Sequence, residues 1–144
     1  MAKVIAVNIS EKKGVIKHPI DKGFFKLNHG LEGDAHAGNW HRMVSFLGNE
    51  SIEKMKATGV EGLCSGKFAE NITTEGIILY ELPVGTKFKV GEVLFEVTQI
   101  GKECHKGCEI MKLVGDCIMP REGIFARVLT EGYIKAGDDI KVEE

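Results

Sequence analysis

The chain has 144 residues, of which 43% are hydrophobic and 28% charged, and its formal net charge is −2. This length fits one domain spanning residues 1–144, which can bury roughly 70% of its unfolded surface and needs neither disulfides nor a metal to fold. The slight acidic balance excludes bulk binding of nucleic acid, which requires a basic surplus, but it is compatible with a local pocket for a small anion.

The N-terminal residues carry one lysine followed by the short run Val4–Val7, which is too short for the apolar core of a signal peptide. No stretch reaches the roughly 18 apolar residues of a membrane-spanning helix. We therefore expect a cytoplasmic protein without a membrane contact. In that compartment the four cysteines (Cys64, Cys104, Cys108 and Cys117) should be thiols. For Cys64 we favour a small buried hydrophobe.

Short apolar stretches separate the eighteen evenly spread glycines and predict many short strands. The expected strands are Lys3–Ile9, Gly23–Leu27, Met43–Leu47, Ile77–Leu82, Thr86–Val90, Val93–Ile100, Ile124–Leu129 and Asp139–Val142. Residues Ile134–Ile140 repeat a strand–glycine–strand pattern before the end of the chain. Strands at this spacing with turns between them favour a sandwich or a barrel.

Two segments are expected to be helical. Asn49–Ala57 begins with a capping residue and ends before Gly59, a common stop for helices. The second helix is expected from about Lys106 to Leu113, where the apolar positions fit one helical face only loosely. The sequence therefore predicts one mainly β unit with one or two short helices.

The first chemically rich segment is His29–Arg42, which holds three histidines, two acids, one arginine and three glycines. Glycine lets the backbone approach a ligand closely, and Arg42 can grip an anion with two parallel hydrogen bonds. A polar surface loop with clustered histidines explains the composition equally well. The residues alone do not decide between these readings.

The second segment, Gly66–Gly76, contains Glu70 and Asn71 inside a strand-like stretch. This pair would offer an acceptor and a donor at one place. Turn capping by Asn71 and Thr73 is the favoured alternative on the residues alone.

The third segment is Gly101–Cys108. Lys102, His105 and Lys106 beside Cys104, together with a helix beginning after it, would favour the ionised thiolate, which is the nucleophile and soft-metal ligand. We favour a reactive Cys104 over a buried one. The set Cys104, His105, Cys108 and Cys117 also offers zinc ligands, but a second neat ligand pair is missing, so an incidental arrangement is favoured.

The three segments, in this order, resemble the MOSC family, named for the C-terminal domain of molybdenum cofactor sulfurase. The similarity covers Val4–Val142. The stretches that carry it are Gly30–His36, Arg42–Ser45, Gly66–Ile72 and Gly101–Cys104, followed by Gly123–Val128 and Gly137–Ile140.

The resemblance implies a small stand-alone bacterial-type member with a twisted closed β-barrel, similar to the barrel of pyruvate kinase. It also implies binding of molybdenum cofactor (molybdopterin) or transfer of its sulfur. In relatives, the cysteine matching Cys104 either carries sulfur as a persulfide or ligates molybdenum. The implied cofactor-binding residues are Gly33, Asp34, His36, Arg42, Phe68, Glu70, Asn71 and His105. We also expect amides of the Gly33–Gly38 loop to help Arg42 hold the anionic pterin phosphate.

The chain shows no desulfurase domain, no extra N-terminal barrel and no iron–sulfur segment of the larger relatives. Pyridoxal phosphate would therefore enter only through a separate cysteine desulfurase, and a molybdoenzyme is the other expected partner. Two alternatives remain open, a molybdenum-dependent reductase of N-hydroxylated small molecules and a zinc-binding module built from the histidine loop and the cysteine cluster. The oligomeric state and the roles of Cys108 and Cys117 also stay open.

Overall fold

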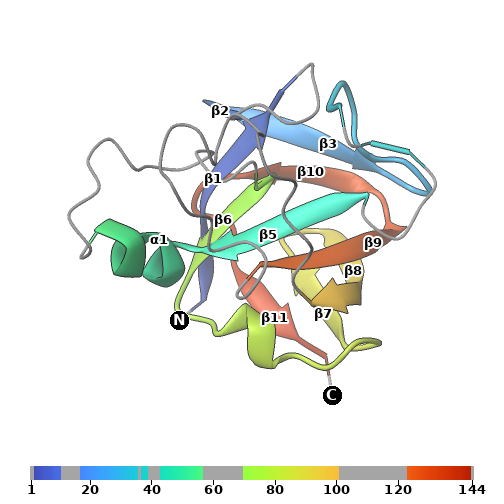
Figure 1. The fold of residues 1–144 in the computed structure, drawn as a ribbon. Coiled ribbons are helices and arrows are strands. Elements are labelled where there is room, and N and C mark those ends of the chain that lie inside the picture. The colour runs from blue at the N-terminus through green and yellow to red at the C-terminus, as the bar shows by residue number, and fades with distance from the viewer. Residues whose placement is uncertain are drawn as a thin grey trace.

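A computed structural model describes residues 2–10, 17–35, 37–38, 43–56, 70–100 and 123–143. In these residues the chain is mainly β, as predicted, with one α-helix and one 3-10 turn (Figure 1). The strands are β1 (Lys3–Ile9), β2 (His18–Ile20), β3 (Lys22–Lys26), β4 (Gly30–Leu31), β5 (Val44–Gly48), β6 (Ile72–Glu75), β7 (Lys87–Val90), β8 (Val93–Ile100), β9 (Ile124–Thr130), β10 (Gly132–Lys135) and β11 (Ile140–Val142). The helix is α1 (Asn49–Lys56) and the 3-10 turn is η1 (Leu79–Glu81).

Eight strands form one sheet in the order β11-β7-β8-β9-β5-β6-β1-β2, and β10, β3 and β4 form a second sheet. All described pairings are antiparallel except that of β5 with β6. The amide of Val4 donates to the carbonyl of Asp138 at 2.9 Å, and the amide of Ile140 donates to that of Ala2 at 3.0 Å. These bonds bring the β11 end of the large sheet back to β1, so the sheet curves round on itself as the predicted barrel requires.

The interior of the curved sheet is apolar because successive strand residues face opposite sides. In β7, Phe88 and Val90 are buried, whereas Lys87 and Lys89, which alternate with them, are exposed. The ring of Phe46 lies 5.2 Å from that of Phe88 and 5.1 Å from that of Phe95, and Phe25 lies 5.8 Å from Phe95. Edge-to-face contacts at these distances are favourable beyond the area they bury.

Most predicted elements are confirmed. The strands Lys3–Ile9 and Val93–Ile100 agree at both ends, three further strands differ by one residue at one end, and two more are shifted by one residue at both ends. The helix Asn49–Ala57 is found as α1, one residue shorter. The helix expected over Lys106–Leu113 lies outside the described residues.

The predicted strand Ile77–Leu82 is wrong. The amide of Leu82 donates to the carbonyl of Leu79 at 3.0 Å, which closes the 3-10 turn η1. Proline at position 83 lacks the amide that a continuing strand would use, and Ile78 is exposed. The strand of this region is β6, directly before the turn.

Candidate functional site

The loop after β4 carries the first predicted segment into contact with β1. Gly30, the first residue of β4, has φ +98°, and a Cβ at this position would lie 2.5 Å from the carbonyl oxygen of Met43. Only glycine permits this close approach at positive φ. The amide of Ala35 then donates to the carbonyl of Ser10 at 2.8 Å, which ties the loop to the end of β1.

Several backbone amides of this segment donate hydrogen bonds to carbonyls of the same segment. Those of Asp34, Ala37 and Gly38 donate to the carbonyls of Leu31, Asp34 and His29. Together with Ala35, four amides of the segment are thus already used. The expectation that the backbone of Gly33–Gly38 holds an anion, which also involves residue 36 outside the described part of the chain, stays a prediction.

Asp34 forms a buried ion pair. Its Oδ1 accepts from Lys17 Nζ at 2.7 Å and from the amide of Ser10 at 3.1 Å, and the side chains of Asp34 and Lys17 have no exposed surface. Lys17 Nζ also donates to Ser10 Oγ at 3.1 Å. Buried charges require partners of this kind, because an unpaired charge in an interior is strongly unfavourable.

The surroundings of Asp34 favour its ionised form. Burial raises the pKa of the carboxyl, but attraction to Lys17 and hydrogen bonds from Lys17, Ser10 and Asn71 outweigh burial. The pKa of Asp34 therefore lies below its ordinary value. The hydrogen bond from Asn71 connects this loop to the second predicted segment.

Glu70 and Asn71 are buried at the start of β6. Asn71 Oδ1 accepts from both the amide and the hydroxyl of Ser45, at 3.0 Å and 3.1 Å. Glu70 Oε2 accepts from the Thr73 hydroxyl at 2.7 Å. These contacts join β6 to β5 through side chains as well as through the sheet.

Asn8 of β1 completes a continuous network. Its Nδ2 donates to the Glu70 carbonyl at 3.2 Å and to Thr73 Oγ1 at 3.1 Å, and its carbonyl accepts from Asn71 Nδ2 at 3.3 Å. Asn8 Oδ1 is buried and has no hydrogen-bond partner among the residues that the structure describes. We call the connected residues the polar network; they are Asn8, Ser10, Lys17, Asp34, Ser45, Glu70, Asn71 and Thr73.

The structure therefore brings together Asp34, Glu70 and Asn71 of the predicted site. Gly33, with φ +88°, belongs to the same loop and is exposed. Turn capping by Asn71 and Thr73 is wrong, since both are buried and Thr73 lies within β6. The other predicted site residues lie outside the described residues; they are His36, Arg42, Phe68, Cys104 and His105.

Sequence reasoning missed five members of the network, namely Asn8, Ser10, Lys17, Ser45 and Thr73. Asn8 carried a usable signal, because an amide within the apolar strand Lys3–Ile9 must find buried partners. Lys17 carried no such signal, since its sequence neighbours do not distinguish it from a lysine exposed to solvent.

The sheet register relates the network to the segment that contains Cys104. Ser45 is hydrogen-bonded to Asn71. In the sheet register Ser45 lies opposite Phe125, and Phe125 lies opposite Gln99. In the adjacent row, Ile72 pairs with Phe46, Phe46 with Ile124 and Ile124 with Ile100. Ile100, the last described residue before residues 101–122, therefore lies in the row of paired residues next to the row that contains Asn71.

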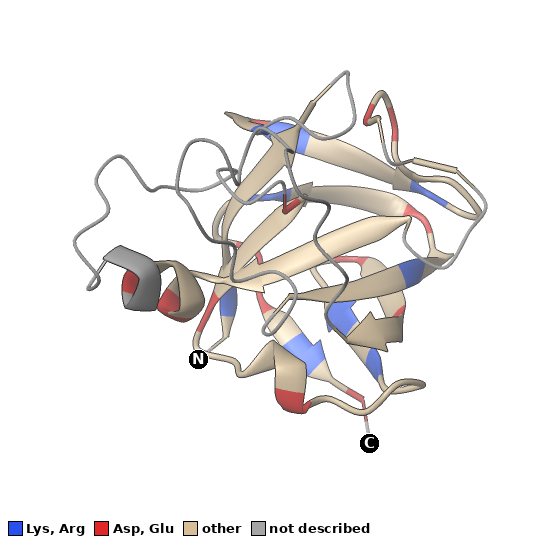
Figure 2. Ribbon diagram, in the orientation of Figure 1, with Lys and Arg blue, Asp and Glu red and all other residues tan. Residues whose placement is uncertain are grey.

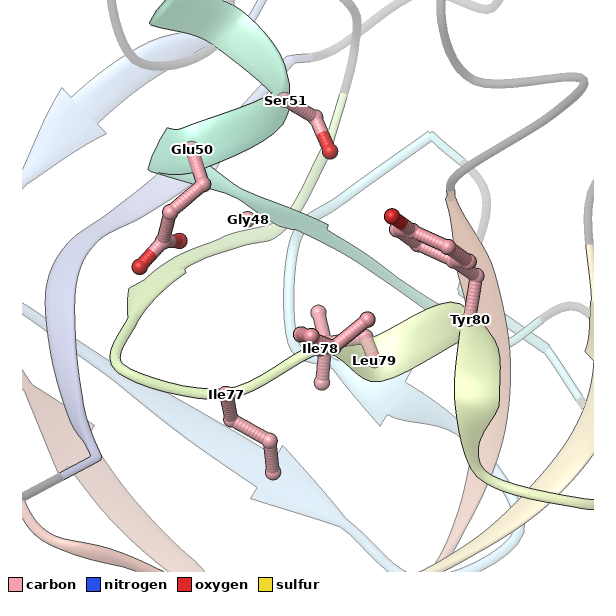
Figure 3. A pocket seen from close by; sticks show the side chains of 7 residues that line it. All are labelled: Gly48, Glu50, Ser51, Ile77, Ile78, Leu79 and Tyr80. Atoms are coloured by element: carbon pink, nitrogen blue, oxygen red, sulfur yellow. The ribbon is translucent and has the colours of Figure 1, made fainter.

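A separate pocket of about 200 Å³ lies between α1 and the η1 region. Figure 3 shows Ser51 and Tyr80 on either side of it, above Ile78 and Leu79. Its remaining lining residues are Gly48, Glu50 and Ile77. None of these is a predicted site residue, and Glu50 already accepts a hydrogen bond from the Gly76 amide at 2.7 Å. The polar network, rather than this mainly apolar pocket, is the candidate site.

Among the described residues, no group of three or more His, Cys, Asp or Glu side chains could hold a metal ion. All four cysteines lie outside them, so the zinc alternative is not tested. In the same part of the chain, no helix is long and apolar enough to cross a membrane.

Comparison with known proteins gives a family and a fold. The model of the MOSC domain matches residues 33–141. The YuaD protein from Bacillus subtilis superposes with a TM-score of 0.81 at 19% identity, covering 99% of this chain and 96% of that chain. YiiM from Geobacillus stearothermophilus gives 0.78 at 20% identity, covering 100% of this chain and 76% of that one. YiiM from Escherichia coli gives 0.72 at 18% identity, with 100% and 70% covered. No curated protein matches the chain.

Proposed function

The chain belongs to the MOSC domain family, and we propose that it binds molybdenum cofactor or carries its sulfur, with Cys104 as the functional thiol. The observation that carries this proposal is the polar network. Asp34 and Asn71 lie far apart in the sequence yet share a hydrogen bond in a buried position. Burying so many polar groups is costly unless they hold a defined arrangement, so the network favours a site rather than a plain core.

Chain length supports a contact between Cys104 and this network. Cys104 is the fourth residue after Ile100, and four residues span at most about 14 Å. Ile100 itself lies one row of the sheet from Gln99, Phe125, Ser45 and Asn71. Ser45 lies two strand spacings, about 10 Å, from β8, so Cys104 can reach this part of the network, whereas Asn71, one strand further, would need a fully extended segment.

The residues present suit the proposed ligand. The Cys104 thiolate is a soft ligand appropriate to molybdenum, and Arg42 would pair with a phosphate. Asn8 Oδ1 is a buried acceptor without a partner in the described part of the chain and would suit an N–H group of a pterin ring. When bound, the cofactor would supply a redox-active metal.

Within this proposal the roles of the network differ from those first expected. Asp34 and Lys17 hold the loop of Gly33 and His36 in place, because their charges are satisfied by each other. Glu70 and Asn71 position β6, with Phe68 and His105 expected nearer to the ligand. Arg42 directly precedes the buried Met43 and would provide the positive charge.

The sulfur-carrier version needs a donor protein that bears a persulfide, such as a cysteine desulfurase. The Cys104 thiolate would attack the terminal sulfur of that persulfide. A new sulfur–sulfur bond would form on Cys104 while the donor's sulfur–sulfur bond breaks and releases the donor thiolate. A molybdoenzyme would be the acceptor. Pyridoxal phosphate belongs to the donor and not to this chain.

Cys104→Ser tests the thiol. Native mass spectrometry of the intact protein should show a pterin adduct or one added sulfur atom in the wild type, and neither in Cys104→Ser, because serine cannot form the persulfide or the soft-metal bond. Molybdenum analysis of the same samples separates the two roles. The matched control is Cys64→Ser, which should keep the adduct or the sulfur.

An adduct that survives in Cys104→Ser would contradict the proposal. So would equal loss in the Cys64→Ser control. Zinc at one per chain without molybdenum would instead support the metal-binding module. Turnover of hydroxylamine-type compounds by the loaded protein with an electron donor would support the reductase.

A further inference from the structure

The outer side of the large sheet carries a group of cations away from the polar network. Lys87 and Lys89 of β7, Lys141 of β11 and Arg127 of β9 are all exposed, and we call these four residues the basic face. Figure 2 shows their strands marked with blue in the lower part of the molecule. A concentration of positive charge is unexpected on a chain whose net charge is −2.

The sheet register places two of these cations directly opposite each other. Lys141 pairs with Lys89 across β11 and β7. Like charges at directly opposed positions destabilise a sheet. Neither lysine forms an ion pair with any residue that the structure describes. Their charge is therefore left for an external anion.

Other described cations are mostly compensated. Lys3 lies 3.6 Å from Glu75, Lys135 lies 3.1 Å from Asp138, and Lys22 lies over the ring of Tyr133. Asp138 and Asp139 line a hollow of about 410 Å³ together with Lys89 and Lys141, but neither is within ion-pair distance of those lysines. Three of the four cations of the basic face, Lys87, Lys89 and Lys141, thus form no ion pair with a described residue, whereas Lys26 on β3 is isolated from them.

Protection of a sheet edge does not explain this pattern. Lysines on an edge strand prevent pairing with other chains, and this would account for Lys141 on β11. Strand β7, however, lies between β11 and β8. Lys87 and Lys89 are therefore on an interior strand that needs no such protection.

We propose that the basic face docks an acidic surface of a partner protein. A second row of the same face favours a protein over a nucleic acid or a membrane. There Lys87 stands opposite Glu96, and Glu96 pairs with Arg127 at 2.6 Å. The amide of Glu143 donates to the carbonyl of Lys87, which places a further acid in this row. Carboxylates on a protein surface can be spaced to meet Lys89 and Lys141 and to avoid the two glutamates, whereas the phosphates of duplex DNA recur about every 1.7 Å along the axis and would also meet the glutamates.

The test removes the opposed pair in the full-length protein, with Lys89→Gln combined with Lys141→Gln. The probe is a fluorescein-labelled random copolymer of glutamate and alanine, whose carboxylates are spaced apart, followed by anisotropy at low salt. Binding should weaken about tenfold, since electrostatic contacts at a docking face contribute strongly to association. Wild-type binding should also weaken sharply at physiological salt, where the screening length falls to about 8 Å. Thermal stability should stay equal or rise, because the opposed like charges are gone.

The matched control is Lys3→Gln combined with Lys26→Gln, which removes the same charge elsewhere. Lys26 is exposed on β3 and has no ion pair among the described residues. Binding of the probe to this control double variant should stay close to that of the wild type. Equal weakening in both double variants, or no binding of the glutamate–alanine copolymer at low salt, would overturn the proposal. Tighter binding of duplex DNA or of phosphatidylglycerol vesicles, lost in Lys89→Gln/Lys141→Gln, would assign the face to that other partner and also overturn it.

Discussion

The apolar interior and the polar network are both buried, yet they are held together by different forces. The interior contains Phe46, Phe88 and Phe95 in ring contact, which are stabilised by non-directional burial and dispersion. The network depends on directional hydrogen bonds and on one ion pair, Lys17–Asp34. An apolar residue can shift slightly at small cost, whereas a buried polar atom that loses its partner pays the whole desolvation penalty.

This difference suggests what each region is for. The interior sets the stability of the curved sheet, and many apolar combinations of similar volume would serve it. The network fixes the relative positions of β1, β6 and the loop of Asp34, because Asn8 donates to Glu70 and Thr73, and Asp34 accepts from the amide of Ser10. A precise site benefits from such fixed support.

The largest expected effect comes from the interior. Phe95→Ala removes a ring that contacts Phe25, Phe46 and Phe88, and the free energy of unfolding should fall by about 4 kcal/mol. The loss should be the same at pH 7 and pH 4, because no titrating group takes part. Urea unfolding at both pH values measures this loss of unfolding free energy. A loss that varied strongly with pH would contradict the claim that only the network depends on a titrating group.

The next effect comes from breaking the ion pair. Lys17→Met leaves Asp34 charged and buried without its main partner, which should cost about 3 kcal/mol. Adding Asp34→Asn to this variant removes the orphaned charge and should recover roughly half of the loss. The double variant is the control for the role of the pair, and urea unfolding again gives the values. Additive losses would mean that Lys17 and Asp34 act independently.

Sequence patterns predicted the interior far better than the network. Alternation along Val93–Ile100 gave that strand at both ends, because burial on one face of a strand repeats every second residue. The segments of Asp34 and of Glu70–Asn71 were also recognised as candidates. No local pattern could pair Lys17 with Asp34 or Ser45 with Asn71, because these contacts depend on how distant strands are arranged. The turn at Leu79–Glu81 was missed because a short apolar run looks alike in a strand and in a 3-10 turn.

The smallest effect, and the most specific to the network, is a dependence on pH. The pKa of Asp34 is lowered in the folded chain, so its ionisation contributes stability above the unfolded pKa of about 3.9 and loses it as pH falls through the lower folded pKa. The difference in unfolding free energy between wild type and Asp34→Asn should therefore be constant from neutral pH down to about pH 5 and shrink below about pH 4. The matched control is Asp138→Asn, which removes a carboxylate whose partner Lys135 is largely exposed and screened by water. Its difference from wild type should be small at every pH and should fade with salt. If the unfolding free energies of Asp34→Asn and the wild type differed by the same amount throughout the acid range, the buried ion pair would not distinguish the network from the interior.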